Sequence, residues 1–352
     1  MRAFSGSLPR VLRRAFLGAT LAVLSGLVQA AVGLTEIPAT EQDGPVTLFY
    51  PTLDAEQPVA RGRFMLSLAE QGAPVRGNGR LIVISHGSGG APWVHTNLAR
   101  ALVEAGFVVA MPLHHADNYK DTSDPGPDSW TIRPAEVSRA IDSVGRDARF
   151  ASLLDLDKVG VYGMSAGGHT ALSMAGGRWS PANFMHHCEE SLVDDFQSCV
   201  GLATRLTGGI FDGVKKWAAL TVIRHRFNDA ALRSHDDPRV AAVVAGVPAS
   251  ADFDMDSLIA PRVPLGLITA GQDHWLIPRF HSDRILQACK TCEHIADLPT
   301  AGHGALLSPL PPGLTGLIGD MLNDPPGFDR SVMHEVDQKI TAFFVHHLLL
   351  QG

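Results

Sequence analysis

Lys158-Val-Gly-Val-Tyr-Gly-Met-Ser-Ala-Gly-Gly-His-Thr-Ala-Leu172 places a serine, Ser165, between an apolar strand pattern and a run of helix formers. Gly-x-Ser-x-Gly in this setting is typical of the nucleophile elbow, a strained turn that lifts the serine hydroxyl clear of a sheet. The glycines two residues before and after the serine keep side chains out of the crowded turn. The stretch predicts a serine nucleophile. A glycine-rich turn with an idle serine is the alternative.

The rest of the chain continues this alternation of buried strands and helices. The expected strands are residues 46–50, 63–68, 81–85, 107–112, 158–162, 240–247, 264–269 and 294–298. The expected helices are residues 92–105, 133–150, 278–289 and 331–350, with Pro134 near the start of the second. This order predicts an α/β fold, with a mostly parallel sheet flanked by helices on both faces. Ligands of such sheets bind beyond the carboxyl ends of the strands.

Two stretches interrupt this rhythm. Residues 180–238 carry acidic clusters and apolar residues at helical spacing, and we predict a helical cap insertion over the active site. A surface excursion without substrate contact is the alternative. Residues 309–328 are rich in proline and glycine, and we expect them to form one wall of the cleft.

Length and charge limit the possible classes of protein. The chain has 352 residues, and residues 31–352 suit one large domain with an insertion. The net charge is −7, and no basic run follows residue 30, so the sequence gives no sign of nucleic-acid binding. No internal repeat or low-complexity tract is present. The sequence does not indicate an oligomeric state.

The N-terminus reads as a secretory signal peptide over residues 1–30. It has a positive n-region, a short apolar stretch and small residues at Val28-Gln29-Ala30. Arg13-Arg14 also resembles a twin-arginine export signal. An uncleaved membrane anchor is the alternative, and no other segment is long enough to span a bilayer. We therefore expect an exported protein, periplasmic or secreted, without stable membrane insertion after cleavage.

Four cysteines are present, which are Cys188, Cys199, Cys289 and Cys292. In an exported protein they predict disulfides. Three connectivities are possible, and we favour the two local pairs. A redox motif or half a zinc site are the rival interpretations of Cys289 and Cys292. The pair follows a helix and has no second Cys-x-x-Cys, so neither rival is supported, and we predict no metal site.

A serine nucleophile needs a histidine base and an acid that orients it. After an elbow serine the usual chain order is acid, then histidine. Asp273 ends the strand pattern of residues 265–273 in a glycine turn, and His303 lies in the glycine loop after the next strand. We predict Ser165, Asp273 and His303 as a catalytic triad.

Other residues compete for these roles. Asp252 and Asp254 are rival acids, since some hydrolases place the acid one strand earlier. Among the sixteen histidines, His274 precedes the last strand and His334 lies in the final helix, where it should face solvent. His114 and His115 follow an earlier strand and fit a substrate-facing loop better than a catalytic position.

The tetrahedral intermediate needs backbone N–H donors. Ala166, which follows the nucleophile, should supply one, and Ser88 in the loop Ser85-His86-Gly87-Ser88-Gly89-Gly90 should supply the other. A phosphate-binding loop is the alternative for this stretch. It lacks the lysine and spacing of a P-loop and the pattern of a dinucleotide fold.

These motifs, together with Pro45-Val-Thr-Leu-Phe-Tyr-Pro51, resemble the exported dienelactone hydrolase-like group of α/β-hydrolases, which is similar to platelet-activating-factor acetylhydrolases. The resemblance covers most of residues 45–350 outside the insertion. It implies ester hydrolysis without a cofactor, with Ser165, Asp273 and His303 as the triad and Ser88 as an oxyanion donor. True dienelactone hydrolases use a cysteine nucleophile, so Ser165 departs from them and lactone hydrolysis is not implied.

The sequence thus predicts a serine carboxylic-ester hydrolase that acts through an acyl-enzyme on a small or medium ester. A serine peptidase or amidase of the same fold is one alternative, although such enzymes usually carry a larger extra domain. A non-catalytic binding protein of this fold is another, although such relatives usually lose the serine or the histidine. The acyl and alcohol groups of the substrate cannot be read from the sequence.

Overall fold

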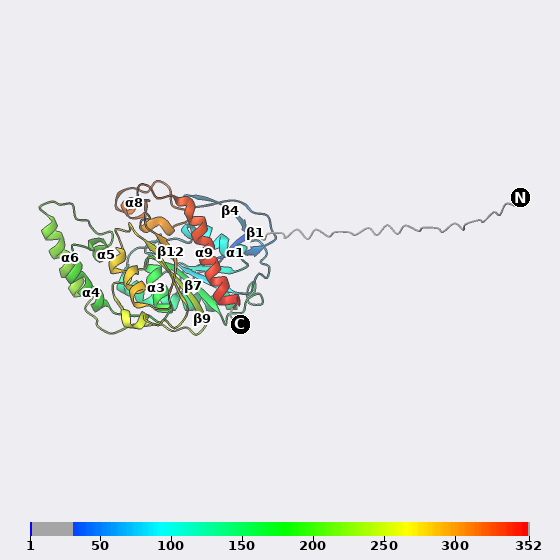
Figure 1. Ribbon diagram of the computed structural model, residues 1–352, viewed down its shortest axis with the longest axis horizontal. Helices are drawn as coiled ribbons and strands as arrows, with labels where there is room; N and C mark the ends of the chain where they lie inside the picture. The colour runs from blue at the N-terminus through cyan, green and yellow to red at the C-terminus, as the bar shows by residue number, and fades with distance from the viewer. Residues whose placement is uncertain (2–30, 351–352) are drawn as a thin grey trace.

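The computed structural model describes Met1 and residues 31–350, so the predicted signal peptide lies outside the described residues apart from Met1. Within them a ten-stranded sheet has the order β12-β11-β9-β7-β5-β6-β2-β1-β4-β3. Figure 1 labels β12, β9, β7, β1 and β4 of this sheet. From β12 to β6 all neighbouring strands are parallel. From β6 to β1 they are antiparallel, β1 and β4 are parallel, and β3 and β4 are antiparallel. The predicted α/β class with a mostly parallel sheet is confirmed.

The strands that hold the candidate site lie in the parallel block. Their bounds are Leu81–Ser85 for β5, Val108–Pro112 for β6, Val159–Met164 for β7, Val240–Gly246 for β9, Leu265–Ala270 for β11 and Glu293–Leu298 for β12. All residues of β5, β6, β7 and β11 are buried, as expected for strands covered on both faces. The carboxyl ends of these strands meet at one edge of the sheet.

The remaining strands form the other side of the sheet. They are β1 (Ala31–Ile37), β2 (Val46–Thr52), β3 (Gln57–Arg61) and β4 (Phe64–Glu70). Strands β1 and β3 were not expected from the sequence. β3 is the edge strand and contains Pro58, a residue that edge strands tolerate, so its strand conformation depends on pairing with β4.

Helices cover both faces of the sheet. Helices α1 (Thr96–Glu104), which follows the short helix η1 (Pro92–His95), and α9 (Met333–Val345), which runs on into a π-helical turn at His346–Leu350, pack into one core. Helices α2 (Pro127–Arg146), α3 (Ala166–Met174) and α7 (Ser282–Ala288) pack into the core on the opposite face. Among the described residues, none of the helices combines the length and the apolar character that a bilayer span requires.

Helix α2 differs from the expected helix over residues 133–150. It begins at Pro127 and ends at Arg146, so Pro134 lies inside it and not near its start. Proline has no N–H, so the Trp130 carbonyl loses its helical donor, a cost that the packing of α2 outweighs. The earlier start places Ser129, Arg133 and Glu136 on one buried face of the helix.

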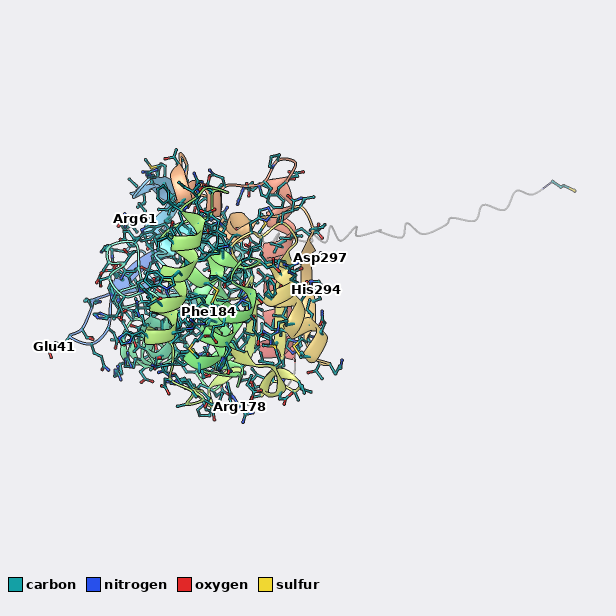
Figure 2. All side chains as sticks on the ribbon, turned by 90° about the vertical axis from the view of Figure 1, so that its left-hand side faces the viewer. Glu41, Arg61, Arg178, Phe184, His294 and Asp297 are labelled. Carbon is teal, nitrogen blue, oxygen red and sulfur yellow. A yellow bond between two sulfur atoms is a disulfide. The ribbon has the colours of Figure 1, made fainter. Side chains whose placement is uncertain are left out.

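Residues 180–238 contain the three helices α4 (Pro181–Ser191), α5 (Phe196–Val200) and α6 (Asp212–Arg226). Just before them, the two-residue strand β8 (Arg178–Trp179) pairs with β10 (Phe253–Asp254). Figure 2 shows the insertion helices lying across one side of the molecule, with Phe184 of α4 near the middle and His294 and Asp297 of β12 toward the edge. The helices share a small apolar core that includes Phe184 and Cys188 of α4. Ala251, which belongs to the main domain, also packs into this core.

Candidate functional site

Ser165 lies in the turn between β7 and α3, with φ 59° and ψ −119°. A left-handed φ at a non-glycine residue is a strained conformation that the surrounding structure must hold in place. The turn also excludes side chains on both sides. A Cβ at Gly163 would lie 1.9 Å from the Gly167 carbonyl oxygen, and a Cβ at Gly167 would lie 1.9 Å from the Ser85 carbonyl oxygen. The turn therefore has the elbow geometry that the sequence predicts.

The structure brings Ser165, His303 and Asp273 together from three distant segments. Ser165 Oγ lies 3.0 Å from His303 Nε2, and His303 Nδ1 lies 2.7 Å from Asp273 Oδ2. His303 and Asp273 are buried, whereas Ser165 remains partly exposed. A proton can therefore pass from the serine hydroxyl to the imidazole, and the carboxylate can hold the proton on Nδ1.

The backbone after Asp273 fixes its carboxylate. Oδ1 accepts hydrogen bonds from the N–H groups of Trp275 at 2.8 Å and Leu276 at 2.9 Å. Oδ2 is left to face His303. These two N–H donors were not predicted from the sequence. The sequence of a glycine turn does not show which carboxylate oxygen the backbone holds and which one faces the histidine.

The rival residues have other partners or positions. Asp252 lies 2.9 Å from His169 Nε2, and Asp254 pairs with Arg178. His274 is exposed, and so is His334, as expected for a solvent-facing position.

His114 is fully buried, so the expectation that it faces substrate is wrong, whereas His115 is exposed. His114 Nε2 lies 2.8 Å from Ser85 Oγ, and its Nδ1 lies 2.6 Å from Glu136 Oε2. This Ser–His–Glu chain has the connectivity of a triad but no access to substrate. Burial, and next the charge of Arg133, hold the pKa of His114 well below its usual value, so the ring is neutral. Glu136 comes from the neighbouring helix α2, in the part that the helix expected over residues 133–150 also covers.

The loop that carries His303 is held by one arginine. His303 begins the short helix η4 (His303–Leu306). Arg330 donates hydrogen bonds to the carbonyls of Gly304 at 3.2 Å, Ala305 at 3.2 Å and Leu307 at 2.6 Å, and it pairs with Asp324. Nothing in the sequence pattern pointed to Arg330, since an arginine before a helix has no distinctive signal.

The stretch expected to form a wall of the cleft lies directly against the His303 loop. It includes the helix α8 (Gly316–Leu322). A Cβ at Gly304 would lie 2.0 Å from the Leu322 carbonyl oxygen, so only glycine allows this approach. A separate hollow of about 310 Å³ lies between β12 and α9 and is lined by none of the three site residues.

One predicted oxyanion donor directly follows Ser165, and the other is in a loop that passes close to it. Ala166 is the first residue of α3, where an N–H has no acceptor within the helix. A Cβ at Gly87 would lie 3.8 Å from Ser165 Oγ, so the loop that carries Ser88 passes beside the nucleophile. The side chain of Ser88 is turned to Asp117, with Oγ donating to Oδ1 at 2.5 Å.

The insertion is fastened to the main domain by a buried carboxylate. Asp195 Oδ2 lies 2.8 Å from His187 Nε2 and 3.2 Å from His281 Nε2, and His281 Nδ1 accepts from the Ser250 N–H. Burial by itself would raise the pKa of Asp195, but the hydrogen bonds from both histidines lower it to about 2. The Cys188–Cys199 disulfide closes the segment around Asp195, and Cys289–Cys292 forms the second local pair. Both pairs are those favoured from the sequence.

Among the described residues, no group of three or more His, Cys, Asp or Glu side chains is arranged to hold a metal ion. Ser165, His303 and Asp273 form a chain of side chains along which a proton can pass.

Comparison with known proteins identifies the fold of this chain but assigns it to no family. No family model matches the chain, and no curated protein matches its sequence. Among solved structures, the chain is similar to a ferulic acid esterase from Streptomyces cinnamoneus, with a TM-score of 0.59 and 16% sequence identity over 94% of each chain. At this identity the likeness shows the fold alone, which is the α/β-hydrolase fold.

Proposed function

We propose that this protein is a serine hydrolase that cleaves carboxylic esters through an acyl-enzyme. The observation that carries the proposal is the continuous chain from Ser165 Oγ through His303 to Asp273, at 3.0 Å and 2.7 Å. The strained elbow supports it, because such strain persists at sites where it serves function.

The geometry supports the following reaction. His303 Nε2 takes the Ser165 proton as Oγ attacks the ester carbonyl carbon, and Asp273 stabilises the resulting imidazolium. The N–H groups of Ala166 and Ser88 stabilise the oxyanion. His303 then gives its proton to the leaving alcohol, which leaves an acyl group on Ser165. Water, deprotonated by His303, attacks this acyl group and releases the acid.

Two finer assignments belong to the same proposal. The motifs quoted for the dienelactone hydrolase-like group favour an exported esterase of that kind, and the two disulfides favour an oxidising compartment, periplasmic or extracellular. We also propose that the helices α4 to α6 form a cap over the site, and the link from Asp195 to His281 supports their attachment to the main domain.

The test is a comparison of the parent with Ser165→Ala. A fluorophosphonate probe should label the parent and not the variant, and the variant should lose about 10³-fold or more of kcat on short p-nitrophenyl esters while its melting temperature stays unchanged. Full activity in the variant would overturn the proposal.

A graded substrate panel defines the ester class. It includes acyl chains of increasing length, methyl ferulate because of the structural neighbour, and an amide matched to one ester. Faster cleavage of the ester than of the amide is expected. The reverse order would favour the amidase alternative.

A further inference from the structure

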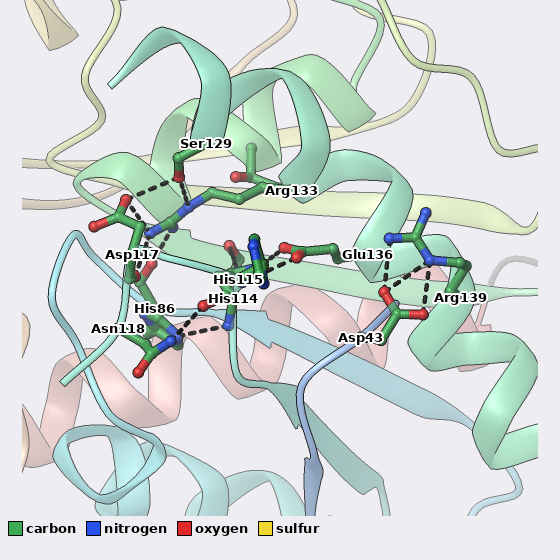
Figure 3. A network of polar contacts seen from close by, with 12 residues as sticks. Asp43, His86, His114, His115, Asp117, Asn118, Ser129, Arg133, Glu136 and Arg139 are labelled. Atoms are coloured by element: carbon green, nitrogen blue, oxygen red, sulfur yellow. Dashed lines mark hydrogen bonds and ion pairs between the residues drawn. The ribbon is translucent and has the colours of Figure 1, made fainter. Parts of the chain in front are cut away.

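Figure 3 shows a fully buried ion pair between Arg133 and Asp117. Asp117 also contacts Ser88, so the pair lies against the loop that carries Ser88. The Arg133 side chain, from the buried face of α2, has no exposed surface. Its Nη2 donates to Asp117 Oδ2 at 2.7 Å and to the Asp117 carbonyl at 3.1 Å. Its Nη1 donates to the His86 carbonyl at 2.6 Å, and its Nε donates to Ser129 Oγ at 2.9 Å. One guanidinium thus ties α2 to two loops.

Asp117 uses both carboxylate oxygens in the same network. Oδ1 accepts from Ser88 Oγ at 2.5 Å and from the Gly89 N–H at 3.0 Å. Oδ2 accepts from Ser129 Oγ at 2.9 Å and from Arg133. Burial by itself would raise the pKa of Asp117, but the Arg133 charge and these hydrogen bonds hold it below its usual value. The carboxylate therefore stays charged and occupied on every side.

The network forms hydrogen bonds to the Ser88 loop at three residues. Arg133 holds the carbonyl of His86, and Asp117 holds the Ser88 side chain and the Gly89 N–H. The segment between these points, at Gly87, passes beside Ser165. The ion pair therefore fixes the residues on both sides of the Ser88 peptide.

Stability alone is a poor explanation for such a pair. Desolvation of two charges costs as much as their attraction returns, so well-packed apolar side chains can replace buried ion pairs without loss. A role in catalysis explains the pair better. Hydrogen-bond donors stabilise a charge that develops in the transition state only if they are held in place before the reaction.

We propose that Asp117 and Arg133 are positioning residues, which hold the Ser88 loop so that its N–H faces the oxyanion in the transition state. The inference rests on the proposed function. Neither side chain touches the reacting atoms. The oxyanion forms only as Ser165 attacks, so a loosened loop should lower kcat and leave KM nearly unchanged.

The test uses three variants and one matched control. Asp117→Asn and Arg133→Lys weaken the pair from each side, and Ser88→Ala removes one partly exposed hydroxyl but keeps the backbone N–H. The control is Ser138→Ala, also on α2, whose Oγ donates to Asp237 Oδ2 at 2.7 Å away from Ser165. Each protein is titrated with an organophosphate that releases p-nitrophenol, so kcat is expressed per labelled serine.

We expect kcat per labelled serine to fall about 10- to 100-fold in Asp117→Asn and roughly threefold to tenfold in Ser88→Ala. The kcat of Arg133→Lys should lie between those of Asp117→Asn and the parent. Lysine keeps the positive charge but lacks the several N–H donors of the planar guanidinium. KM and the pH profile of kcat/KM should stay at parental values, since His303 and Asp273 are untouched. Ser138→Ala should match the parent.

Two results would overturn the inference. One is a kcat per labelled serine in both Asp117→Asn and Ser88→Ala within about twofold of Ser138→Ala. The other is a rise in KM with unchanged kcat. A purely structural role would lower the labelled fraction or the melting temperature without changing kcat per labelled serine. A parent that is not labelled at all overturns the proposed function itself, so the two failures are distinguishable.

Discussion

His169 Nε2 lies 2.9 Å from Asp252 Oδ2, in a pair that is buried beside the nucleophile turn. The indole of Trp130 stacks on the His169 ring, with centroids 5.0 Å apart. Asp252 is therefore engaged with helix α3, and the carboxylate that faces His303 is that of Asp273. Asp252 follows β9 and Asp273 follows β11, which are adjacent in the sheet. Their different partners indicate a structural role for Asp252 and the proposed catalytic role for Asp273.

Substitution of each aspartate by asparagine should separate these roles. Asp273→Asn should lower kcat by about 10³- to 10⁴-fold, because an amide cannot hold His303 in the required tautomer or balance its charge. Asp252→Asn should keep kcat within about tenfold of the parent, because an amide oxygen can still accept from His169. Steady-state kinetics on p-nitrophenyl butyrate measures both. Equal losses in the two variants would contradict the assignment of Asp273.

The elbow glycines should not tolerate a methyl group. Gly163→Ala and Gly167→Ala place a Cβ 1.9 Å from a backbone oxygen, so we expect each to destabilise the fold by about 1–3 kcal/mol or more. Gly213→Ala is the matched control, because nothing lies within 4 Å of its Cβ on helix α6. It should stabilise the protein by about 0.4–1 kcal/mol. Urea denaturation followed by circular dichroism gives the free energies, and comparable effects at all three glycines would contradict the expectation.

Asp337 should make stability fall as the pH rises. Burial raises the pKa of this carboxyl from 3.8 to about 7, so between these values the folded state holds a proton that the unfolded state has lost. Stability from this group is present below about pH 4 and is lost through about pH 7, by up to about 4 kcal/mol.

Asp337→Asn should remove this dependence, and the variant should exceed the parent in stability most at pH 8 and least at pH 4. Denaturant midpoints across this range measure the difference between the two proteins. A difference that does not change with pH would show that the carboxyl titrates normally.

The two disulfides should differ in their contribution to stability. Loss of Cys188–Cys199, which spans 11 residues, should cost about 3 kcal/mol, and loss of Cys289–Cys292, which spans 3, about 2 kcal/mol, since the longer loop constrains the unfolded chain more.

The first loss should also loosen the insertion, because the loop it closes carries Asp195. Double Cys→Ser variants, compared by thermal melting and by limited proteolysis of residues 180–238, measure both effects. Earlier cleavage of residues 180–238 in the variant without Cys289–Cys292 than in the variant without Cys188–Cys199 would contradict this expectation.

Local sequence determined the elements that carry the site. The run around Ser165 specified a strand, a tight turn and a helix, because β-branched residues, glycines and small helix formers each act through neighbours a few residues away. The same reasoning placed Asp273 and His303 after the strands that now end at one edge of the sheet. The favoured disulfides are local as well, since 3 and 11 residues separate their cysteines.

Tertiary structure alone decided which side chains meet. Whether Asp252 or Asp273 faces His303, and whether His114 faces solvent or Ser85, depends on packing between segments far apart in the sequence. The link from Arg133 to His86 spans 47 residues and that from Ser165 to His303 spans 138. A hydrogen bond requires approach to about 3 Å, and local residue preferences carry no information about distances between segments.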